Sequence, residues 1–316
     1  MPGNSHPPIL PADDSAIARA AAVLRAGGLV AVPTETVYGL AARADSEAAV
    51  ARIYAAKGRP DFNPLIVHVP GVTAGERLAR FDERALALAA AFWPGALTMV
   101  LPRRTDAALA PAVTAGLPTV ALRCPAHPAM RALLAATDLP LAAPSANRSG
   151  GVSPSQAGHV ASSLGNKVDL ILDGGACERG IESTIVALRD GGGWQVLRPG
   201  PVTEAAISAI LGPAHDGMAE DRGIEAPGQL ASHYAPGKPV RLNALTAQPD
   251  EFHIGFGAVP GDISLSSGGD LAEAAARLYT CLHAAAAAPQ PRVAIAPVPE
   301  EDIGAAINDR LRRAAA

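Results

Sequence analysis

The sequence predicts an α/β protein with two domains. At 316 residues the chain is long for a single hydrophobic core. Short apolar runs alternate with segments of helical periodicity, which is typical of a sheet covered by helices. Between 212 and 239 this alternation stops, and the segment is rich in Gly, Pro, Asp and His. We therefore expect a first domain over 1–211, a linker over 212–239 and a smaller domain over 240–316.

Apolar runs mark the expected strands, because a strand covered on both faces is apolar throughout. In the first domain they cover 29–32, 64–69, 97–101, 119–122, 139–143, 170–172, 183–188 and 194–197. In the second domain they cover 240–245, 252–256 and 293–296. Together with the helices between them, these strands favour a three-layer arrangement of helices around a sheet.

Helix boundaries follow from capping residues and helical spacing. Helices are expected over 14–26, 84–93, 127–136, 203–211, 269–286 and 303–315. Asp45 is expected to cap a further helix that ends at Lys57, where Gly58 follows. Ser153 is expected to cap another, with Pro154 at its first position. Lys57 lies in the last turn of its helix, on the same face as the buried apolar residues, so its ammonium group should emerge at the rim of the core.

Composition argues against several classes of protein. A net charge of −4 and 3% aromatic residues argue against a general nucleic-acid-binding surface. Cys124, Cys177 and Cys281 are too widely spaced for a zinc knuckle or a disulfide framework. We therefore expect the protein to reside in the cytosol, where cysteines stay reduced. The N-terminus lacks the pattern of a signal peptide, and no apolar run reaches about 18 residues. We therefore expect a cytoplasmic location and no membrane span.

Polar side chains gather beside the expected strand ends. They are Thr34 to Thr36; Lys57, Arg59, Asn63 and His68; Arg123; Ser145, Asn147, Ser153 and Ser155; and Ser183 and Thr184 with Arg198. Open α/β sheets bind ligands in the crevice beyond their strand ends. Hydroxyls, amides and cations there suit a ligand with phosphates and a carboxylate. No P-loop, G-x-S-x-G, H-E-x-x-H or EF-hand motif is present.

Taken singly, each of these residues has an adequate structural explanation. Lys57 can extend from a helix end and favour the helix dipole. His68 within an apolar run fits a core histidine, Ser153 fits a helix cap, and Tyr234 fits an aromatic plug over the domain surface. The order and the coincidence of the clusters favour a shared functional site.

Several motifs, taken in order, resemble a known family. They are Pro33-Thr34-Glu35-Thr36-Val37-Tyr38-Gly39-Leu40, Lys57-Gly58-Arg59-Pro60 with Asn63-Pro64-Leu65, Pro144-Ser145-Ala146-Asn147, Ser183-Thr184-Ile185-Val186 and Leu197-Arg198-Pro199-Gly200. The series is similar to the signature of the YrdC-like family. Ala226-Pro227-Gly228, His233-Tyr234-Ala235-Pro236 and the segment from Gly304 to Arg310 further resemble its long, two-domain threonylcarbamoyl-AMP synthases.

The resemblance implies a fold and a reaction. The fold is a twisted, mixed YrdC-like α/β sheet with a concave cavity, plus a smaller Rossmann-like C-terminal α/β domain and a linker that reaches over the cavity. The reaction joins L-threonine, bicarbonate and ATP into L-threonylcarbamoyladenylate and pyrophosphate, with magnesium accompanying ATP. A tRNA threonylcarbamoyl transferase complex then uses the product to modify tRNA, and the resemblance leaves room for a weak tRNA contact.

The resemblance also implies roles for individual residues. It places Thr36, His68, Arg123, Ser145 and Ser183 at threonine. It places Arg59, Asn63, Thr119, Asn147, Ser155, Arg198 and Tyr234 at ATP, and it leaves Ser153 open as the alternative to Ser155. Lys57 and Arg59 form the family's basic pair and are the expected catalytic residues. No residue is implied as a metal ligand.

Two other functions remain open at this point. A concave surface with arginines could bind double-stranded RNA or tRNA, although the net acidity and the scarcity of aromatics weigh against it. A carbamoyltransferase-type YrdC-like enzyme would use carbamoyl phosphate. The chain lacks the acylphosphatase-like and zinc-finger segments that accompany such domains.

Overall fold

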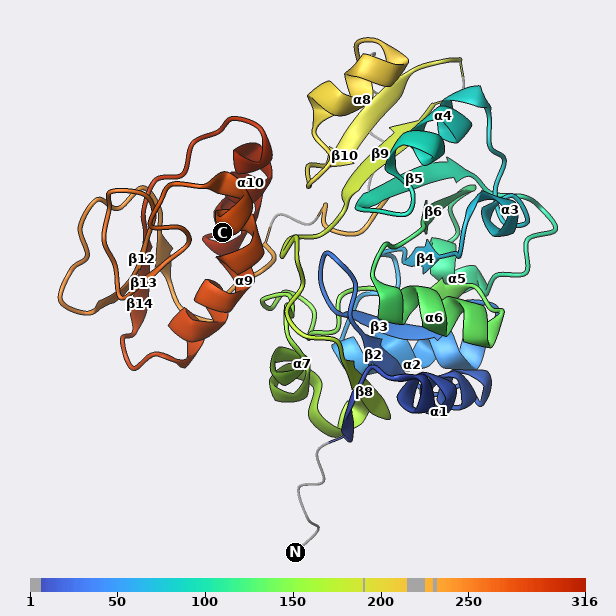
Figure 1. Cartoon of the computed structure of the whole chain (residues 1–316), viewed down its shortest axis with the longest axis horizontal. Helices are drawn as coiled ribbons and strands as arrows, with labels where there is room; N and C mark the ends of the chain where they lie inside the picture. Colours follow the sequence, from blue (N-terminus) through green and yellow to red (C-terminus); the bar gives the residue numbers. More distant parts are fainter. Residues whose placement is uncertain (1–6, 190, 215–224, 230–231) are drawn as a thin grey trace, which may run out of the picture.

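A ten-stranded mixed sheet and a four-stranded parallel sheet organise the chain. The computed structural model describes residues 7–189, 191–214, 225–229 and 232–316. Part of the expected linker, 215–224 and 230–231, therefore lies outside the described residues. Figure 1 shows the two sheets in separate α/β units that lie side by side. None of the described helices is both long and apolar enough to cross a membrane.

The large sheet has the strand order β1-β8-β2-β3-β7-β4-β6-β5-β9-β10. Its strands are β1 (Ile9–Pro11), β2 (Val30–Val32), β3 (Gly39–Arg43), β4 (Ile66–His68), β5 (Leu97–Pro102), β6 (Thr119–Arg123), β7 (Leu141–Ala142), β8 (Leu170–Asp173), β9 (Thr184–Leu188) and β10 (Trp194–Arg198). Both parallel and antiparallel pairs occur in it, for example β4 with β6 and β4 with β7 respectively. The expected mixed sheet is confirmed.

Helices cover the two faces of this sheet. They are α1 (Asp14–Arg25), α2 (Glu47–Lys57), α3 (Val72–Gly75), α4 (Glu83–Phe92), α5 (Pro111–Thr114), α6 (Pro128–Thr137), α7 (Ala157–Leu164) and α8 (Glu204–Leu211), with a short 3-10 turn, η1, at Gly165–Lys167. In β2, Val30 and Val32 pack against α1 and α6, whereas Ala31 packs with the cluster that contains α2, α4 and α7. The alternation of side chains along a strand explains this division.

One part of the sheet is covered by linker residues in place of a helix. Ile66, Val100, Ala121 and Ile185 form a small separate cluster with Ala226. Side chains two positions along the same strands share this face. The polar residues at the strand ends therefore lie beside a linker-covered surface, which leaves room for a pocket.

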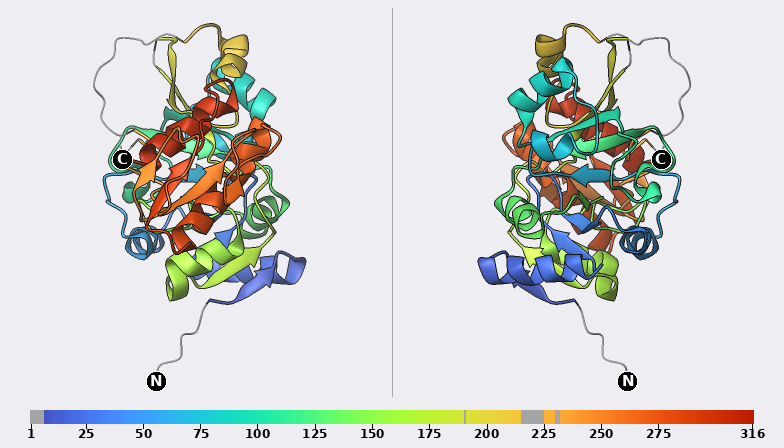
Figure 2. Two further views of the ribbon diagram at one scale, coloured as in Figure 1. Left: turned by 90° about the vertical axis from the view of Figure 1, so that its left-hand side faces the viewer. Right: turned by 90° about the vertical axis from the view of Figure 1, so that its right-hand side faces the viewer.

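The C-terminal unit has the strand order β11-β14-β12-β13. Its elements are β11 (Val240–Arg241), β12 (Glu251–Gly255), β13 (Ile263–Ser264), α9 (Leu271–Ala287), β14 (Arg292–Ile295) and α10 (Ile303–Ala314). Figure 1 shows α9 and α10 between this sheet and the larger unit, and in the views of Figure 2 the C-terminal unit and the larger unit overlap. Val37, Val152 and Ile181 of the first unit belong to the same buried cluster as these helices. The two units therefore share a continuous apolar contact.

Two expected helix caps are wrong. Ser46, not Asp45, caps α2 by accepting a hydrogen bond from the Ala49 amide, because Asp45 is engaged by Arg43 at 2.7 Å. The helix expected to begin at Ser153 begins at Ala157. Ser153 instead donates to the buried carboxylate of Glu182 at 2.6 Å, which is a stronger partner than a backbone amide.

Candidate active site

Most of the predicted site residues meet in one pocket. It spans ≈ 500 Å³, including space open to solvent, at the linker-covered face of the large sheet. The predicted residues that line it are Thr36, Arg59, His68, Arg123, Ser145, Ser183, Arg198 and Tyr234. They come from separate strand ends, from the loop after α2 and from the linker, and the fold brings them together as the sequence analysis expected.

Arg123 at the end of β6 is the central cation of one wall. Its Nη2 donates to Glu35 Oε1 at 2.5 Å, and its Nη1 donates to Thr36 Oγ1 at 2.8 Å. Burial alone would raise the pKa of Glu35, but the Arg123 charge holds that pKa below its usual value. Glu35 therefore stays ionised, fixes the guanidinium and cancels much of its charge.

Strand register places His68 and Thr98 next to Arg123. His68 pairs with Arg123 across β4 and β6, and Thr98 pairs with it across β5 and β6. Burial and then the Arg123 charge lower the pKa of His68 to about 3. His68 is therefore a neutral imidazole, and its buried Nδ1 has no hydrogen-bond partner among the described residues. A buried ring nitrogen without a partner is a candidate contact for a bound molecule.

Lys57 lies behind the pocket wall. Its Nζ donates to the backbone carbonyl oxygens of Ser145 and Asn147, both at 2.6 Å. Burial, followed by the nearby Arg59 charge, lowers the pKa of Lys57 well below its ordinary value. Lys57 is only 3% exposed, so its ammonium group lies inside the structure, where it holds the loop that carries Ser145.

Arg59 turns back toward the loop that follows it. Its Nε donates to Asn63 O at 3.2 Å and its Nη2 to Pro64 O at 2.9 Å. Burial and the charge of Arg198 contribute to lowering the pKa of Arg59 to about 10, although Tyr54 opposes them. The guanidinium is therefore still a cation at neutral pH, and its neighbour Asn63 has a buried Oδ1 with no partner among the described residues.

Arg198 and Ser183 form a further part of the pocket lining. Arg198 donates to Ser183 O from Nε at 3.1 Å and from Nη2 at 2.9 Å. Ser183 Oγ lies 2.8 Å from Thr98 Oγ1, which the sequence analysis missed because Thr98 lies inside an apolar run. The β9 and β10 strand ends thus bring a hydroxyl and a guanidinium to the same wall.

The linker closes the pocket with Gly228 and Tyr234. Tyr234 has a φ of 65°, an uncommon left-handed conformation for a non-glycine residue. The side chain is buried, and its hydroxyl has no hydrogen-bond partner among the described residues although it lines the pocket. An orphaned buried hydroxyl points to a bound molecule as its partner.

The remaining predicted residues do not line this pocket. Asn63 and Asn147 are buried beside lining residues, and Asn147 Oδ1 also lacks a partner among the described residues. Ser155 contacts Thr280 Oγ1 at 3.2 Å, in the domain interface. Thr119 lies at the other end of β6 from Arg123. The ATP roles assigned to these residues stay predictions.

Glu182 is the main residue that the sequence analysis missed. It lines the pocket and accepts hydrogen bonds from Ser153, from the hydroxyl of Tyr279 at 2.6 Å and from Arg310 Nε at 3.2 Å. Burial would raise its pKa, but the charges of Arg310 and Arg198 lower that pKa to about 2. The only sequence signal was an acidic residue immediately before Ser183.

The pocket does not provide a metal site of its own. Among the described residues no group of three or more His, Cys, Asp or Glu side chains is placed to hold a metal ion. The carboxylates of Glu35 and Glu182 are committed to Arg123 and Arg310.

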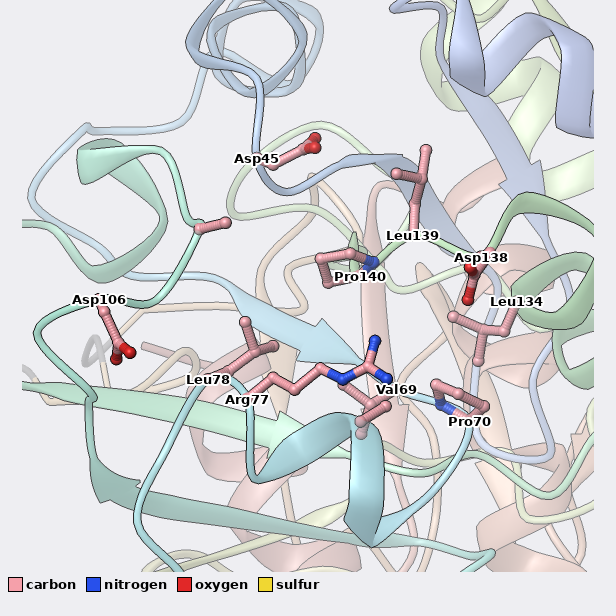
Figure 3. A pocket seen from close by; sticks show the side chains of 12 residues that line it. Asp45, Val69, Pro70, Arg77, Leu78, Asp106, Leu134, Asp138, Leu139 and Pro140 are labelled. Atoms are coloured by element: carbon pink, nitrogen blue, oxygen red, sulfur yellow. The ribbon is translucent and has the colours of Figure 1, made fainter.

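A larger pocket of ≈ 840 Å³ lies elsewhere, between α6 and the loop around α3. Figure 3 shows Arg77 extending into it, with Asp45, Asp106 and Asp138 at its margins. Its lining is otherwise largely apolar and includes none of the predicted site residues. The chemistry of the strand-end pocket, not its size, identifies it as the candidate active site.

Comparisons with known proteins agree with this site. Residues 22–200 match the Sua5_yciO_yrdC family, described as "Telomere recombination", and residues 202–316 match Sua5_C, the "Threonylcarbamoyl-AMP synthase, C-terminal domain". The threonylcarbamoyl-AMP synthase of Bacillus subtilis is 47% identical over 241 residues, which cover 74% of this chain and 68% of that protein. The Pyrococcus abyssi synthase is 38% identical over 320 residues, covering 93% of this chain and 92% of that protein.

Solved structures give the same result. The crystal structure of P. abyssi Sua5 complexed with L-threonine matches with a TM-score of 0.88 at 35% identity, covering 97% of each chain. Escherichia coli YciO matches with a TM-score of 0.55 at 22% identity over 64% of this chain and 98% of that one, which supports the fold alone. The expected YrdC-like sheet with a second α/β domain is confirmed. The chain belongs to the Sua5/YciO/YrdC family, in the two-domain form that carries a Sua5-type C-terminal domain.

Proposed function

We propose that this chain forms L-threonylcarbamoyladenylate and pyrophosphate from L-threonine, bicarbonate and ATP. The observation that carries the proposal is the convergence of Arg59, Arg123 and Arg198 with an orphaned Tyr234 hydroxyl on one pocket. Relatives that align over most of the chain are threonylcarbamoyl-AMP synthases, and one related structure is described as a complex with L-threonine. Because an adenylyl group is transferred, the enzyme would be a nucleotidyltransferase.

Threonine binding is assigned to the wall built by Thr36, His68, Arg123, Ser145 and Ser183. Arg123 keeps N–H groups beyond those that it gives to Glu35, Thr36 and Gly95, because a guanidinium carries five. These groups would meet the substrate carboxylate. Neutral His68 and the hydroxyls of Thr36 and Ser183 would read the substrate hydroxyl, and an analogue lacking it would leave them unpaired at a cost of about 1–3 kcal/mol.

ATP binding is assigned to the basic side of the pocket. Arg59 and Arg198 are both buried enough for their charges to act in a low dielectric. They would bind phosphate oxygens, while Lys57 holds the Ser145 loop in place. Asn63, Thr119, Asn147, Ser155 and Tyr234 complete the proposed ATP contacts, and magnesium would enter with the triphosphate.

The proposed chemistry needs positioning and charge neutralisation more than a protein nucleophile. The threonine amine must lose a proton before it bonds to carbon dioxide derived from bicarbonate, and a partly buried pocket favours the neutral amine. A carbamate oxygen then attacks the α-phosphorus, and pyrophosphate leaves. Arg59 would neutralise the charge that develops on the phosphate oxygens, an effect worth roughly 3 kcal/mol of barrier for one donor.

The product would serve a downstream partner. A tRNA threonylcarbamoyl transferase complex is the proposed consumer, in the cytoplasm, and a weak contact with tRNA is compatible with that role. The linker that carries Gly228 and Tyr234 would act as a lid, because a water-poor pocket protects a labile carbamate and adenylate.

The test is pyrophosphate release measured across a panel of amino acids with and without bicarbonate. We expect release only when L-threonine, bicarbonate and ATP are all present. Release with carbamoyl phosphate in place of L-threonine and bicarbonate would favour the carbamoyltransferase alternative. Retention of double-stranded RNA without any substrate-dependent release would favour the RNA-binding alternative.

A further inference from the structure

A fully buried arginine of the C-terminal domain lies behind residues that line the pocket. Arg310 is on α10, and its side chain is 0% exposed. Its Nε donates to Glu182 Oε2 at 3.2 Å, and its Nη1 donates to Pro199 O at 2.5 Å. Its Cζ lies 5.7 Å from the centroid of the Tyr234 ring. The Arg310 guanidinium is therefore in contact with two residues that line the pocket, Glu182 and Tyr234, and with Pro199, the neighbour of the lining residue Arg198.

Two of these contacts are at the strand ends that carry site residues. Glu182 immediately precedes Ser183, and Pro199 immediately follows Arg198. The two segments approach closely, since a Cβ on Gly200 would lie 2.4 Å from the Thr184 amide nitrogen. A planar guanidinium that bonds both segments fixes their separation, and with it the geometry between Ser183 and Arg198.

The third contact holds Tyr234. Its ring packs on Tyr279 of α9, with centroids 5.6 Å apart, and against Arg310 of α10. Tyr279 also donates its hydroxyl to Glu182, so one carboxylate joins both C-terminal helices to the pocket. Helices α9 and α10 of the C-terminal domain therefore hold Tyr234, a linker residue with a left-handed φ, in its place at the pocket.

A simple attachment of the domains would not need this charge. Polar contacts such as His283 to Ser153 O at 3.1 Å and the apolar cluster around α9 already join the two units. A buried ion pair adds little net stability compared with apolar residues of the same volume. A guanidinium adds directional hydrogen bonds, because one side chain donates to both the Glu182 carboxylate and the Pro199 carbonyl oxygen.

We infer that Arg310 is a positioning residue of the C-terminal domain, which sets Ser183, Arg198 and Tyr234 for the nucleotide through Glu182 and Pro199. The kinetic test of this inference rests on the proposed function. The inference gives the C-terminal domain a role in the active site beyond carrying the linker, and it accounts for Arg310 in the Asn308-Asp309-Arg310 segment.

The test compares wild type with Glu182→Gln, Arg310→Met, Arg310→Lys and the Glu182→Gln/Arg310→Met double variant. The double variant removes both members of the Arg310–Glu182 pair, so it keeps the inference testable if Arg310→Met fails to fold. Glu182→Gln alone reports what the loss of the Glu182 charge does to its other buried partner, Arg198. We expect kcat/KM for ATP to fall at least tenfold in the folded double variant. Arg310→Lys should recover thermal stability but not kcat/KM, because an ammonium cannot bond both segments.

Arg312→Met is the matched control, since Arg312 lies on the same helix but is 57% exposed and pairs only with Glu300 in the described part of the chain. It should keep kcat/KM within threefold. In a Tyr234→Phe background, Arg310→Lys should cost at least threefold less than it does in wild type, because part of its effect passes through that hydroxyl. An equal cost in both backgrounds, or wild-type kcat/KM in the double variant, would overturn the inference.

Hydrogen exchange separates this inference from the proposed function. Amides of 182–186 and 232–236 should exchange faster in the double variant than in wild type, and Arg312→Met should leave them unchanged. This readout needs no substrate. If wild type makes no adenylate, the proposed function fails while the exchange result still decides the positioning role. Unchanged exchange in a folded double variant counts against Arg310.

Discussion

Arg123 and Glu35 form a buried ion pair in the wall of the candidate active site, with Nη2 2.5 Å from Oε1 and side chains only 4% and 7% exposed. Glu35 also accepts the amide hydrogen of Ala126. The pair therefore fixes one guanidinium between two segments of chain while leaving part of its N–H array for a ligand. This geometry separates two effects of Arg123, one on folding and one on binding.

Replacement of Arg123 by Met should lower both the stability of the fold and the affinity for L-threonine. Removing one partner of a buried ion pair leaves the other charge uncompensated, so the free energy of unfolding should fall by about 3–5 kcal/mol. Adding Glu35→Gln should recover most of that stability without restoring L-threonine binding. Calorimetric unfolding and isothermal titration with L-threonine measure the two quantities. Normal threonine affinity in the double variant would refute the assignment.

Arg59→Ala should reduce the rate of pyrophosphate release by about 10²–10³-fold, because a charge-stabilising donor is lost in a buried site. The fold should be retained, since the Arg59 bonds to Asn63 O and Pro64 O are local. Arg52→Ala on the preceding helix α2 is the control, as Arg52 forms an exposed ion pair with Asp169. Its rate should stay within threefold of wild type. Equal rates in the two variants would remove Arg59 from the mechanism.

Lys57→Met should lower both stability and turnover. It leaves the Ser145 and Asn147 carbonyl oxygens without their donor, and each buried unsatisfied acceptor costs about 1–3 kcal/mol. Turnover should fall at least tenfold, because the loop that carries Ser145 loses its support. Lys167→Met, which removes a single lysine bond to Ala56 O at 3.3 Å, should change neither quantity appreciably. Thermal denaturation and steady-state rates provide the comparison.

Gly228→Ala tests the linker side of the pocket. A Cβ there would lie 2.9 Å from Arg198 Cδ and 3.2 Å from Arg198 Nη1, so the Arg198 side chain would have to move, whereas the Tyr234 hydroxyl at 3.5 Å would be in ordinary contact. We expect KM for ATP to rise about tenfold. Gly237→Ala is the control because it has a similar positive φ, 76° against 84°, but open space around its Cβ. A similar rise in KM in both variants would assign the effect to backbone strain alone.

The stability of the protein should depend on pH through Glu182. Its pKa in the folded state is about 2 against an ordinary 4.5, as burial is outweighed by the charges of Arg310 and Arg198. A depressed folded pKa contributes stability above about pH 4.5 that is lost as pH falls toward about 2. Urea unfolding from pH 6 to pH 3 should therefore show a steeper loss in wild type than in Glu182→Gln. Parallel curves would contradict the low pKa of this carboxylate.

The main elements of the fold followed from the sequence because they are long and periodic. The strands expected at 97–101 and 194–197 and the helix capped by Thr203 appear within a residue or two of their expected ends. The expected pattern lacked β1, β3 and β13. Strands β1 and β13 are only three and two residues long and not buried, whereas β3 is a buried five-residue strand that begins at the end of the Pro33 motif. Strands as short as β1 and β13 are stabilised by pairing with distant strands, which no local pattern reports.

Site residues could be predicted from the sequence where they belong to a local motif and their own side chains line the pocket. Arg59, Ser145 and Arg198 are of this kind. Glu182 and Arg310 were not, since their importance arises from a contact between residues 128 positions apart. The cap assigned to Ser153 failed for the same reason, because a distant carboxylate outweighed the local helix signal.

The most direct test of the whole account is mass spectrometry of the product formed from ¹³C-bicarbonate, L-threonine and ATP. We predict a threonine- and ATP-dependent adenylate that carries one ¹³C atom, formed together with an equal amount of pyrophosphate and lost in Arg59→Ala. An adenylate without the label, or no adenylate from folded wild-type protein, would contradict the proposed reaction.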